Sequence, residues 1–409
     1  MEVKNCRICK SPDLYKFLDL GEMPLANSFL KEDELGKPEP AYPLDAVLCK
    51  NCGFVQIGHL VPPEIMFKNY IYFSSTSDTI RKHFAEEAQE IRQKFCQKGS
   101  LVVEIGSNDG VLLKNLLGTG VRPLGVEPAT NVAAVAREAG VETLNDFFSL
   151  KTAKSIRAEK GKAAVIIANN VFGHVPDPHD LVGGVSELLE ETGVMMIEVP
   201  YLADFYNKLE FDTIYHEHLS YFSLKPMMHL FGMFGMVVFD VKKFPVHGGT
   251  IRVYIQKKGG LHKVEQANIN KFLELEKSMG LYEPAAYDKF AERVKRLKVD
   301  LTGLLRKLKS EGKLVAAYGA PAKGNTLLCY CGIGTELVEY AVDKSPYKQD
   351  LYTPGMHIPV YGLDKMKGRK PDYLLILAWN FADEIMRQQS DFAAAGGKFI
   401  IPIPEPRII

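Results

Sequence analysis

Two histidines, a glutamate and two tyrosines lie close together in the stretch FDTIYHEHLSYFS, residues 211–223. Imidazole and carboxylate groups can bind a metal ion or move protons near neutral pH. A zinc-hydrolase site is disfavoured, because His216 and His218 lack the four-residue helical spacing of HExxH. An acid–base centre and a plain surface segment remain open. His216 shares a face with His218 only if the segment is extended, which the sequence does not decide.

Four of the seven cysteines form two pairs, Cys6 with Cys9 in CRIC and Cys49 with Cys52 in CKNC. Two such turns can complete the tetrahedral four-thiolate shell of a structural zinc ion. A redox role needs a thioredoxin-like helix after the pair, and neither pair has one. The long gap between the pairs predicts an inserted loop. We expect bound zinc to stabilise a short amino-terminal segment that has little core of its own.

The composition excludes several classes of protein. Lys+Arg 50 against Asp+Glu 50 leaves no positive excess for a nucleic-acid backbone. The chain has no run of 18 apolar residues, and MEVKNCRICK does not resemble a secretory signal. We therefore expect a cytoplasmic protein with no nucleic-acid or membrane partner, and a monomer. A length of 409 residues predicts two or three domains.

Beyond residue 85, apolar runs alternate with segments of helical spacing, which predicts an α/β fold with a parallel sheet. We expect strands at 101–106, 122–128, 163–170 and 193–200, and helices at 110–117 and 131–140. Ligands on such sheets bind at the carboxyl ends of the strands. The loops at those ends are therefore the candidate sites.

The loop EIGSNDG, residues 104–110, lacks the GxGxxG pattern of nicotinamide cofactors and favours a cofactor without phosphate. Glu127 ends the second strand, where an acidic side chain can accept hydrogen bonds from ribose hydroxyls. Amides and a carboxylate follow the next strands and suit an adenine edge and an amino-acid group. The candidate cofactor-binding residues are Gly106, Asn108, Asp109, Glu127, Pro128, Asp146, Asn169 and Asn170.

The pattern E-x-G-x-x-x-G, followed by Glu127 and by NNVFGHV at 169–175, resembles the class I S-adenosylmethionine (SAM) methyltransferases. The cysteine pairs, LDLGEMPLANSF, YIYFSSTSDT, YHEH and FPVHGGTIRVY are together similar to the nucleotide-sugar C-methyltransferases of branched deoxysugar biosynthesis. This resemblance implies SAM and structural zinc as cofactors. It also implies a 4-keto-6-deoxyhexose on a nucleoside diphosphate, usually dTDP, that is methylated at C3.

Methylating a carbon requires a carbanion equivalent, and a 4-keto group acidifies the C3 proton by accepting the charge on oxygen. A base must then face C3, and hydrogen-bond donors must face the C4 oxygen. The resemblance implies that His218 is the base and that Glu217, Tyr215, His174 and Tyr72 line the same centre. The role of His247, beside two glycines, stays open.

The carboxy-terminal third starts with two amphipathic helices between 261 and 312 and then repeats the strand, glycine loop and helix pattern. Small residues let the backbone approach an anion, and the amides that open the helix point toward it. The resemblance places the nucleotide here; a degenerate repeat without ligand is the alternative. The candidate substrate-binding residues are Gly319, Ala322, Lys323, Gly324, Asn325, Lys348, Gln349 and Asn380.

We therefore expect a zinc-binding domain (1–75), a class I methyltransferase Rossmann-like domain (76–256) and a second Rossmann-like α/β domain (257–409) that binds the nucleotide sugar. An O- or N-methyltransferase on a related substrate would keep the donor pocket without needing an enolate. A zinc-bearing binding or regulatory protein that retains the fold is the second alternative.

Overall fold

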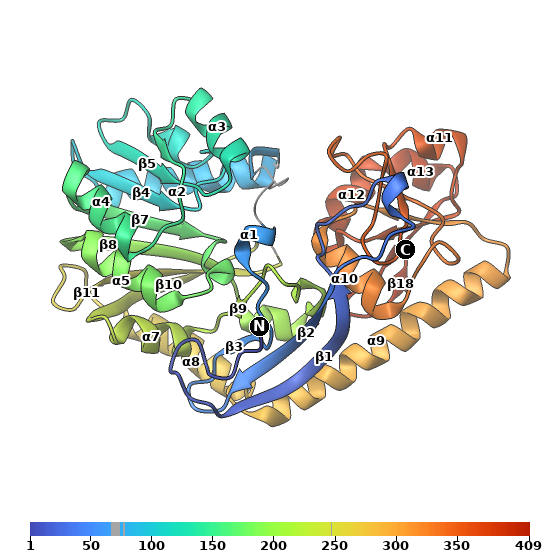
Figure 1. The fold of residues 1–409 in the computed structure, drawn as a ribbon, viewed down its shortest axis with the longest axis horizontal. Helices are drawn as coiled ribbons and strands as arrows, with labels where there is room; N and C mark the ends of the chain where they lie inside the picture. The colour runs from blue at the N-terminus through green and yellow to red at the C-terminus, as the bar shows by residue number, and fades with distance from the viewer. Residues whose placement is uncertain (67–73, 77, 247) are drawn as a thin grey trace.

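The computed structural model describes residues 1–66, 74–76, 78–246 and 248–409. These residues form one four-stranded sheet and two seven-stranded sheets. Figure 1 shows two α/β halves side by side, with the strands β1 and β2 and the long helix α9 running along one side of both.

The first half is built on a mixed seven-stranded sheet. Strand β11 is antiparallel to both neighbours, while the strands from β8 to β6 are parallel. This sheet confirms the Rossmann-like core that the sequence predicts. In spatial order its strands are β10 (Met236–Phe244), β11 (Thr250–Lys257), β8 (Leu189–Pro200), β7 (Ala163–Asn169), β4 (Leu101–Ile105), β5 (Arg122–Val126) and β6 (Thr143–Leu144).

Helices cover both faces of this sheet. Strand side chains alternate between the two faces, so Val102 packs with α2 on one side while Leu101 and Val103 pack with α4, α5 and α7 on the other. Every residue of β7 is buried, as expected of a strand between two helical layers. The helices are α2 (Asp78–Phe95), α3 (Thr130–Glu138), α4 (Leu150–Lys160), α5 (Pro178–Leu188), α6 (Leu202–Asn207) and α7 (Leu224–Gly232).

The helix expected at 110–117 is wrong in type and length. The structure has only a 3-10 turn, η3 (Leu113–Leu116), between two glycines in the left-handed region, Gly110 and Gly118. Left-handed glycines break helical hydrogen bonding on both sides, so the segment cannot extend into an α-helix. Three buried leucines of this segment still pack against α2.

The amino-terminal sheet contains β1 (Leu14–Pro24), β2 (Ala41–Cys49), β3 (Val55–Ile57) and β9 (Ser220–Tyr221). Strand β9 comes from the segment that follows the YHEH run, so this sheet is shared between distant parts of the chain. β1 packs on α9 through Phe17, whose ring centroid lies 4.6 Å from that of Tyr287. Short helical turns lie at η1 (Glu32–Glu34), α1 (Pro63–Met66) and η2 (Ser74–Thr76).

The second half follows α8 (Gln266–Ser278) and α9 (Pro284–Ser310). Its sheet has a parallel centre and an antiparallel strand at each edge, which confirms the second Rossmann-like domain. In spatial order the strands are β14 (Leu351–Tyr352), β15 (Pro359–Tyr361), β13 (Ala341–Val342), β12 (Val315–Tyr318), β16 (Tyr373–Ile376), β17 (Lys398–Ile401) and β18 (Arg407–Ile408). Its helical segments are α10 (Ala322–Cys331), α11 (Lys365–Gly368), η6 (Trp379–Phe381), α12 (Ala382–Gln388) and α13 (Ser390–Ala394).

One hydrophobic core runs through all three sheets. It joins side chains of β1 and β2 with one face of each large sheet, through α9 and α10. The amino-terminal strands therefore tie the two halves together. Within the described ranges, no helix is both long and apolar enough to cross a membrane.

Candidate active site and zinc site

The YHEH run is a tight turn, neither strand nor helix. The His218 amide donates to the carbonyl of Tyr215 (2.8 Å), and this turn brings the two side chains together. The Tyr215 hydroxyl lies 2.8 Å from Nε2 of His218, and their ring centroids are 4.0 Å apart. The turn begins just after η5 (Phe211–Thr213).

The hydrogen bonds of His218 define its tautomer. Its Nδ1 lies 2.8 Å from the carbonyl oxygen of Thr213, which can only accept, so Nδ1 carries a proton. In a neutral ring Nε2 then carries the lone pair and accepts the Tyr215 hydroxyl. His218 is thus held with its basic nitrogen toward Tyr215.

His174 lies beside His218, while the Glu217 side chain of the same turn bonds Asn27. The His174 ring lies edge-on to the His218 ring, with centroids 4.9 Å apart. Burial lowers the pKa of His174 to about 4, so its ring is neutral at physiological pH. Burial raises the pKa of Glu217 to about 7, while the amide of Asn27, 2.7 Å away, favours the charged carboxylate. Two imidazoles therefore lie side by side, and a carboxyl group with a raised pKa lies in the same turn.

His216 has a separate place. Its side chain is buried, its Nε2 lies 3.2 Å from the carbonyl of Tyr42, and its ring stands edge-on to the Tyr42 ring. It therefore fastens strand β2 to the turn instead of joining His218. The candidates Tyr72 and His247 lie outside the described residues.

The first strand of the methyltransferase-like half ends in the loop that holds Gly106. Gly106 has a φ of 65°, and a Cβ there would lie 2.6 Å from Val171, so no larger residue fits. Both oxygens of Glu127 accept backbone amides, from Asn108 (3.0 Å) and Ala129 (2.8 Å). Glu127 thereby joins the ends of β4 and β5.

Asn108 and Asp109 also hold the segment that enters from the amino-terminal part. Their side chains accept the amides of Ser74 (2.9 Å) and Ser75 (3.1 Å). The sequence assigned them to the cofactor alone, and the structure adds this second role.

Several buried polar atoms of this loop, of α2 and of the end of β7 have no hydrogen-bond partner in the described part of the chain. They are Glu104 Oε2, Ser107 Oγ, Asp109 Oδ1, Asn169 Oδ1 and Glu87 Oε1. Unpartnered buried acceptors are costly, and several around one loop are typical of a site that a ligand completes. The amino group and ribose hydroxyls of SAM would supply the missing donors, so the residues fit this cofactor.

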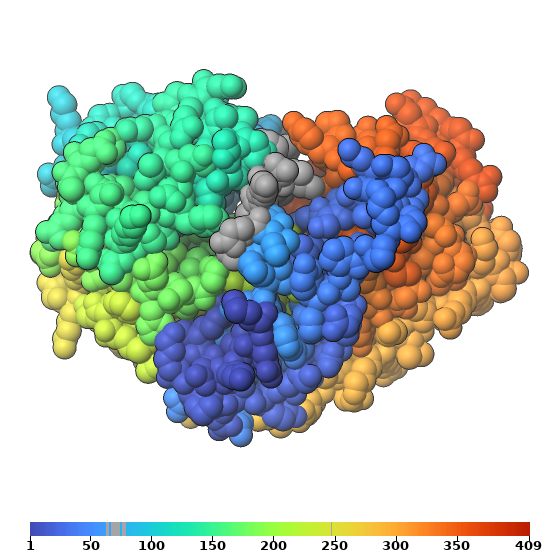
Figure 2. Space-filling model, viewed as in Figure 1, coloured from blue at the N-terminus to red at the C-terminus, as the bar shows by residue number. Residues whose placement is uncertain are grey.

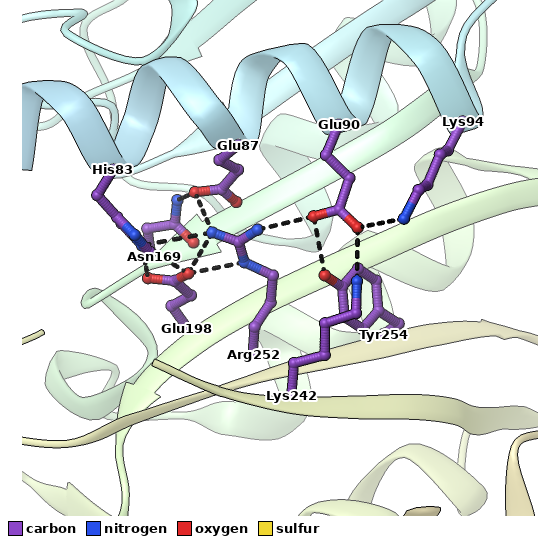
Figure 3. A network of polar contacts seen from close by, with 9 residues as sticks. All are labelled: His83, Glu87, Glu90, Lys94, Asn169, Glu198, Lys242, Arg252 and Tyr254. Carbon is purple, nitrogen blue, oxygen red and sulfur yellow. Dashed lines mark hydrogen bonds and ion pairs between the residues drawn. The ribbon is translucent and has the colours of Figure 1, made fainter. Parts of the chain in front are cut away.

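Asn169 contacts a charged network through Glu87 of α2 (Figure 3). The Asn169 amide donates to Glu87 (2.8 Å), and Glu87 pairs with Arg252 (3.0 Å). Arg252 also donates to the Glu198 carboxylate, and Nε2 of His83 lies 2.9 Å from the same carboxylate. His83, Glu87 and Glu198 lie close enough to bind a metal ion, but the Arg252 guanidinium already occupies the cationic position between them. This network is therefore structural.

Asp146 and its neighbour Asn145 follow the short strand β6. The Asp146 side chain is exposed and accepts the adjacent Phe147 amide. Asn145, which the sequence analysis missed, donates to the carbonyls of Glu127 (2.8 Å) and Pro128 (3.0 Å). Its position at the end of a strand is the sequence feature that could have identified Asn145.

The four amino-terminal cysteines come together as predicted. Sγ of Cys6 lies 3.6 Å from Sγ of Cys52, and Sγ of Cys9 lies 3.5 Å from Sγ of Cys49. Four sulfurs at about 2.3 Å from one zinc ion are about 3.8 Å apart, so this cluster fits the ion. The residue after each pair, Lys10 or Gly53, adopts positive φ and closes the turn.

In the second half, the glycine loop after β12 contacts an acid that the sequence analysis did not select. Asp343, at the end of β13, accepts the Ala320 amide (2.8 Å) and lies 3.8 Å from Nζ of Lys348. Lys348 donates to the Ala320 carbonyl (2.8 Å), and Gln349 donates to the Asp343 carbonyl (3.0 Å). The sequence could have identified Asp343, because it is an acidic residue at the end of the second strand of its domain, as Glu127 is in the first half.

Lys323 joins the two halves. It lies over the Trp379 ring (4.4 Å to the centroid) and bonds Asn380. Trp379 in turn donates to Asp212 of the first half (2.7 Å). Burial lowers the pKa of Lys323 to about 8, while the negative charges of Asp212 and Glu210 oppose that shift.

All three parts of the chain meet at Tyr215. A cavity of about 10 Å³ lies between Tyr215, Ala26 and Asn325, and the Asn325 amide donates to the Ala26 carbonyl (2.7 Å). Figure 2 shows the surface hollowed between the two halves, above the blue amino-terminal strands. The YHEH turn thus lies where the halves and the amino-terminal segment converge. Gly319 lies in the loop before α10, and Ala322 and Gly324 lie in its first turn.

Three family models match this chain in succession. They are described as "Putative zinc binding domain" for residues 6–67, "Methyltransferase domain" for 80–240 and "C-methyltransferase C-terminal domain" for 245–404. The first covers the four cysteines, and the second covers the cofactor loop and the YHEH turn.

The chain is similar to several known proteins. C-methyltransferase NovU of Streptomyces niveus is 38% identical over 408 residues, covering 100% of this chain and 97% of NovU. A ubiquinone biosynthesis O-methyltransferase of Glaesserella parasuis is 29% identical over 24% of this chain and 44% of its own length. A solved SAM-dependent methyltransferase from Anabaena variabilis covers 43% of this chain and 85% of its own, at 17% identity and a TM-score of 0.36. With a full-length relative and matching zinc-binding, methyltransferase and C-terminal domains, this chain belongs to the family of SAM-dependent C-methyltransferases.

Proposed function

We propose that this C-methyltransferase methylates C3 of a 4-keto-6-deoxyhexose carried on a nucleoside diphosphate, with dTDP as the nucleotide. The enzyme would first remove the C3 proton and then place the resulting enolate carbon against the methyl donor. The protein would act as a cytoplasmic monomer. The proposed domains are 1–75, 76–256 and 257–409.

The His218 geometry carries this proposal. Nδ1 of His218 is bonded to the Thr213 carbonyl, which leaves Nε2 as the basic atom and would stabilise the ring once it takes a proton. The hydroxyl oxygen of Tyr215 lies 2.8 Å from this basic nitrogen. A carbon acid needs such a base, whereas methylation of a hydroxyl or amine needs no enolate.

The neighbouring groups suit the developing negative charge. His174 would line this centre with a neutral ring, and Glu217 could donate a hydrogen bond to the C4 oxygen in its protonated form. Bound SAM supplies an electrophilic methyl group, so the protein has to hold the enolate carbon in line with it. Tyr72, which lies outside the described residues, is proposed to line the same centre.

The two remaining sites follow the sequence-based assignments. SAM would be held by Gly106, Asn108, Asp109, Glu127, Pro128, Asp146, Asn169 and Asn170. The nucleotide sugar would be held by Gly319, Ala322, Lys323, Gly324, Asn325, Lys348, Gln349 and Asn380. The loop amides before α10 and the nearby lysines provide donors for a diphosphate.

Solvent exchange tests this proposal. In D₂O without SAM, the enzyme should replace the C3 hydrogen of dTDP-4-keto-6-deoxyglucose with deuterium faster than the uncatalysed reaction, as mass spectrometry can measure. The His218→Asn variant should not. Methylation on oxygen without such exchange would support the O-methyltransferase alternative. A screen of keto-sugar nucleotides for the gain of one methylene would then identify the sugar.

A further inference from the structure

Arg7 lies inside the first cysteine turn, between Cys6 and Cys9, yet its side chain does not face solvent. It is 7% exposed, and its guanidinium reaches into the methyltransferase half. Nη1 donates to the carbonyls of Val175 (2.8 Å) and Pro176 (3.4 Å). Nη2 donates to the Ser220 hydroxyl (2.6 Å) and to the Leu219 carbonyl.

These acceptors belong to the two segments that carry the active-site imidazoles. Val175 directly follows His174, and Leu219 directly follows His218. The two segments contact each other through one backbone hydrogen bond, from the Leu219 amide to the Gly173 carbonyl (2.8 Å). Arg7 adds a further connection through the carbonyls of Val175 and Leu219.

The rest of the cysteine region supports this connection. The Arg7 amide donates to Gln56 (2.9 Å), whose strand β3 pairs with β9 through Gln56 and Ser220. The guanidinium lies 5.7 Å from the Phe54 ring centroid, and Phe54 packs against Phe222. The carbonyl oxygen of the next residue, Ile8, accepts a hydrogen bond from Nε2 of His179 (2.6 Å). The zinc-binding turn is therefore packed against the active-site segments.

A guanidinium is suited to this position. It is planar and presents donors in fixed directions, so it can hold carbonyls of two separate segments at one spacing. Lysine offers a single point charge on a flexible stem and cannot reproduce both directions. Zinc binding fixes the backbone on both sides of Arg7, since Cys6 and Cys9 are both ligand candidates.

We propose that Arg7 is a positioning residue that sets the spacing between His174 and His218, so that the zinc-binding turn is part of the support of the catalytic centre. This inference rests on the proposed catalytic role of the two histidines. In this proposal, Arg7 contacts neither substrate nor SAM. Its effect passes through the backbone of Val175 and Leu219.

The test compares Arg7→Met, Arg7→Lys and Arg7→Ala with Lys4→Met, which removes an exposed cation from the same segment. We expect Arg7→Met to keep its zinc and lower kcat about 100-fold with little change in KM for either substrate, because ring spacing and not binding is altered. Arg7→Lys should recover only part of the rate. Free guanidinium at non-denaturing concentration should raise the rate of Arg7→Ala, and Lys4→Met should behave as wild type.

A second measurement does not depend on catalysis. The chain has 10 histidines, and the ring ¹³Cε1–¹H signals of His174 and His218, assigned by His→Asn variants, should both shift in zinc-loaded Arg7→Lys. If both signals stay in place and kcat is unchanged in zinc-loaded Arg7→Lys and Arg7→Met, the positioning role is wrong. If the signals move but wild-type enzyme methylates no keto-sugar nucleotide, the proposed function is wrong and the positioning role stands.

Discussion

At the scale of single residues, a turn creates the catalytic candidate. Tyr215 and His218 are three positions apart, and only a turn closed by the His218 amide brings their side chains to 2.8 Å. In the same turn His216 points to Tyr42 and Glu217 to Asn27. Adjacent residues of one short run therefore have different roles.

Replacing the proposed base should abolish product formation. In His218→Asn we expect kcat to fall by about 10²–10⁴, since general-base catalysis contributes that much, while SAM binding by calorimetry stays unchanged. His229→Asn, exposed on α7, is the matched control and should retain full activity. Turnover at tens of percent of wild type in His218→Asn would show that another group is the base.

Glu217 should make stability depend on pH. Its pKa is raised from 4.5 to about 7, so the folded protein keeps a proton that the unfolded chain releases. Its contribution to the free energy of unfolding therefore falls as pH rises from about 4.5 to 7, by about 3 kcal/mol at most. Urea unfolding at several pH values should show a flatter dependence in Glu217→Gln. The exposed Glu138→Gln should keep the wild-type slope, and an equally steep slope in Glu217→Gln would contradict the assignment.

At the scale of elements, β1 and β2 connect the zinc site with the rest of the molecule. Tyr42 of β2 and Asn27, three residues after the end of β1, contact the YHEH turn, and β1 packs along α9. β9 completes their sheet from the other side of the active site. Loss of zinc should therefore affect elements far from the cysteines.

Removing one zinc ligand should destabilise the whole protein. In Cys49→Ser we expect loss of bound zinc and a Tm lowered by about 10 °C, because metal binding contributes directly to folding. Plasma emission spectrometry and calorimetry measure the two effects. Cys96→Ser, a thiol outside the cluster, should keep its metal. Pure wild-type protein without zinc would refute the four-thiolate site.

At the scale of the molecule, the two halves are joined by a buried charged contact. The indole of Trp379 donates to Asp212, and Lys323 lies over the same indole. Glu210, with a pKa raised by burial to about 7, adds a second acid near Lys323. The relative placement of the halves therefore depends on ionisable groups near the proposed substrate site.

This contact should be visible in fluorescence. Trp379 is the single tryptophan, and burial raises the pKa of its partner Asp212 to about 6. Tryptophan emission should change with a midpoint near pH 6 as Asp212 gains its proton and the charged hydrogen bond is lost. Asp212→Asn should remove the transition, whereas the exposed Asp300→Asn should leave it. A transition of the same size in Asp212→Asn would assign it to another group.

The sequence by itself determined the local patterns. Cysteine spacing predicted the metal shell, and the apolar runs predicted the parallel centres of the two large sheets, because buried strands are rich in apolar residues. The loop EIGSNDG predicted a cofactor site, and the structure adds unpartnered acceptors there. These features depend on residues close together in the chain, so local patterns were enough.

Only the tertiary structure decided how distant segments combine. The sequence could not place Arg7 against Val175 and Leu219, or Trp379 against Asp212, because no local pattern encodes contacts over such separations. It also predicted a helix where two left-handed glycines allow only η3, and left the role of His216 open. Packing made these choices, since a buried polar side chain is stabilised where a distant partner hydrogen-bonds it.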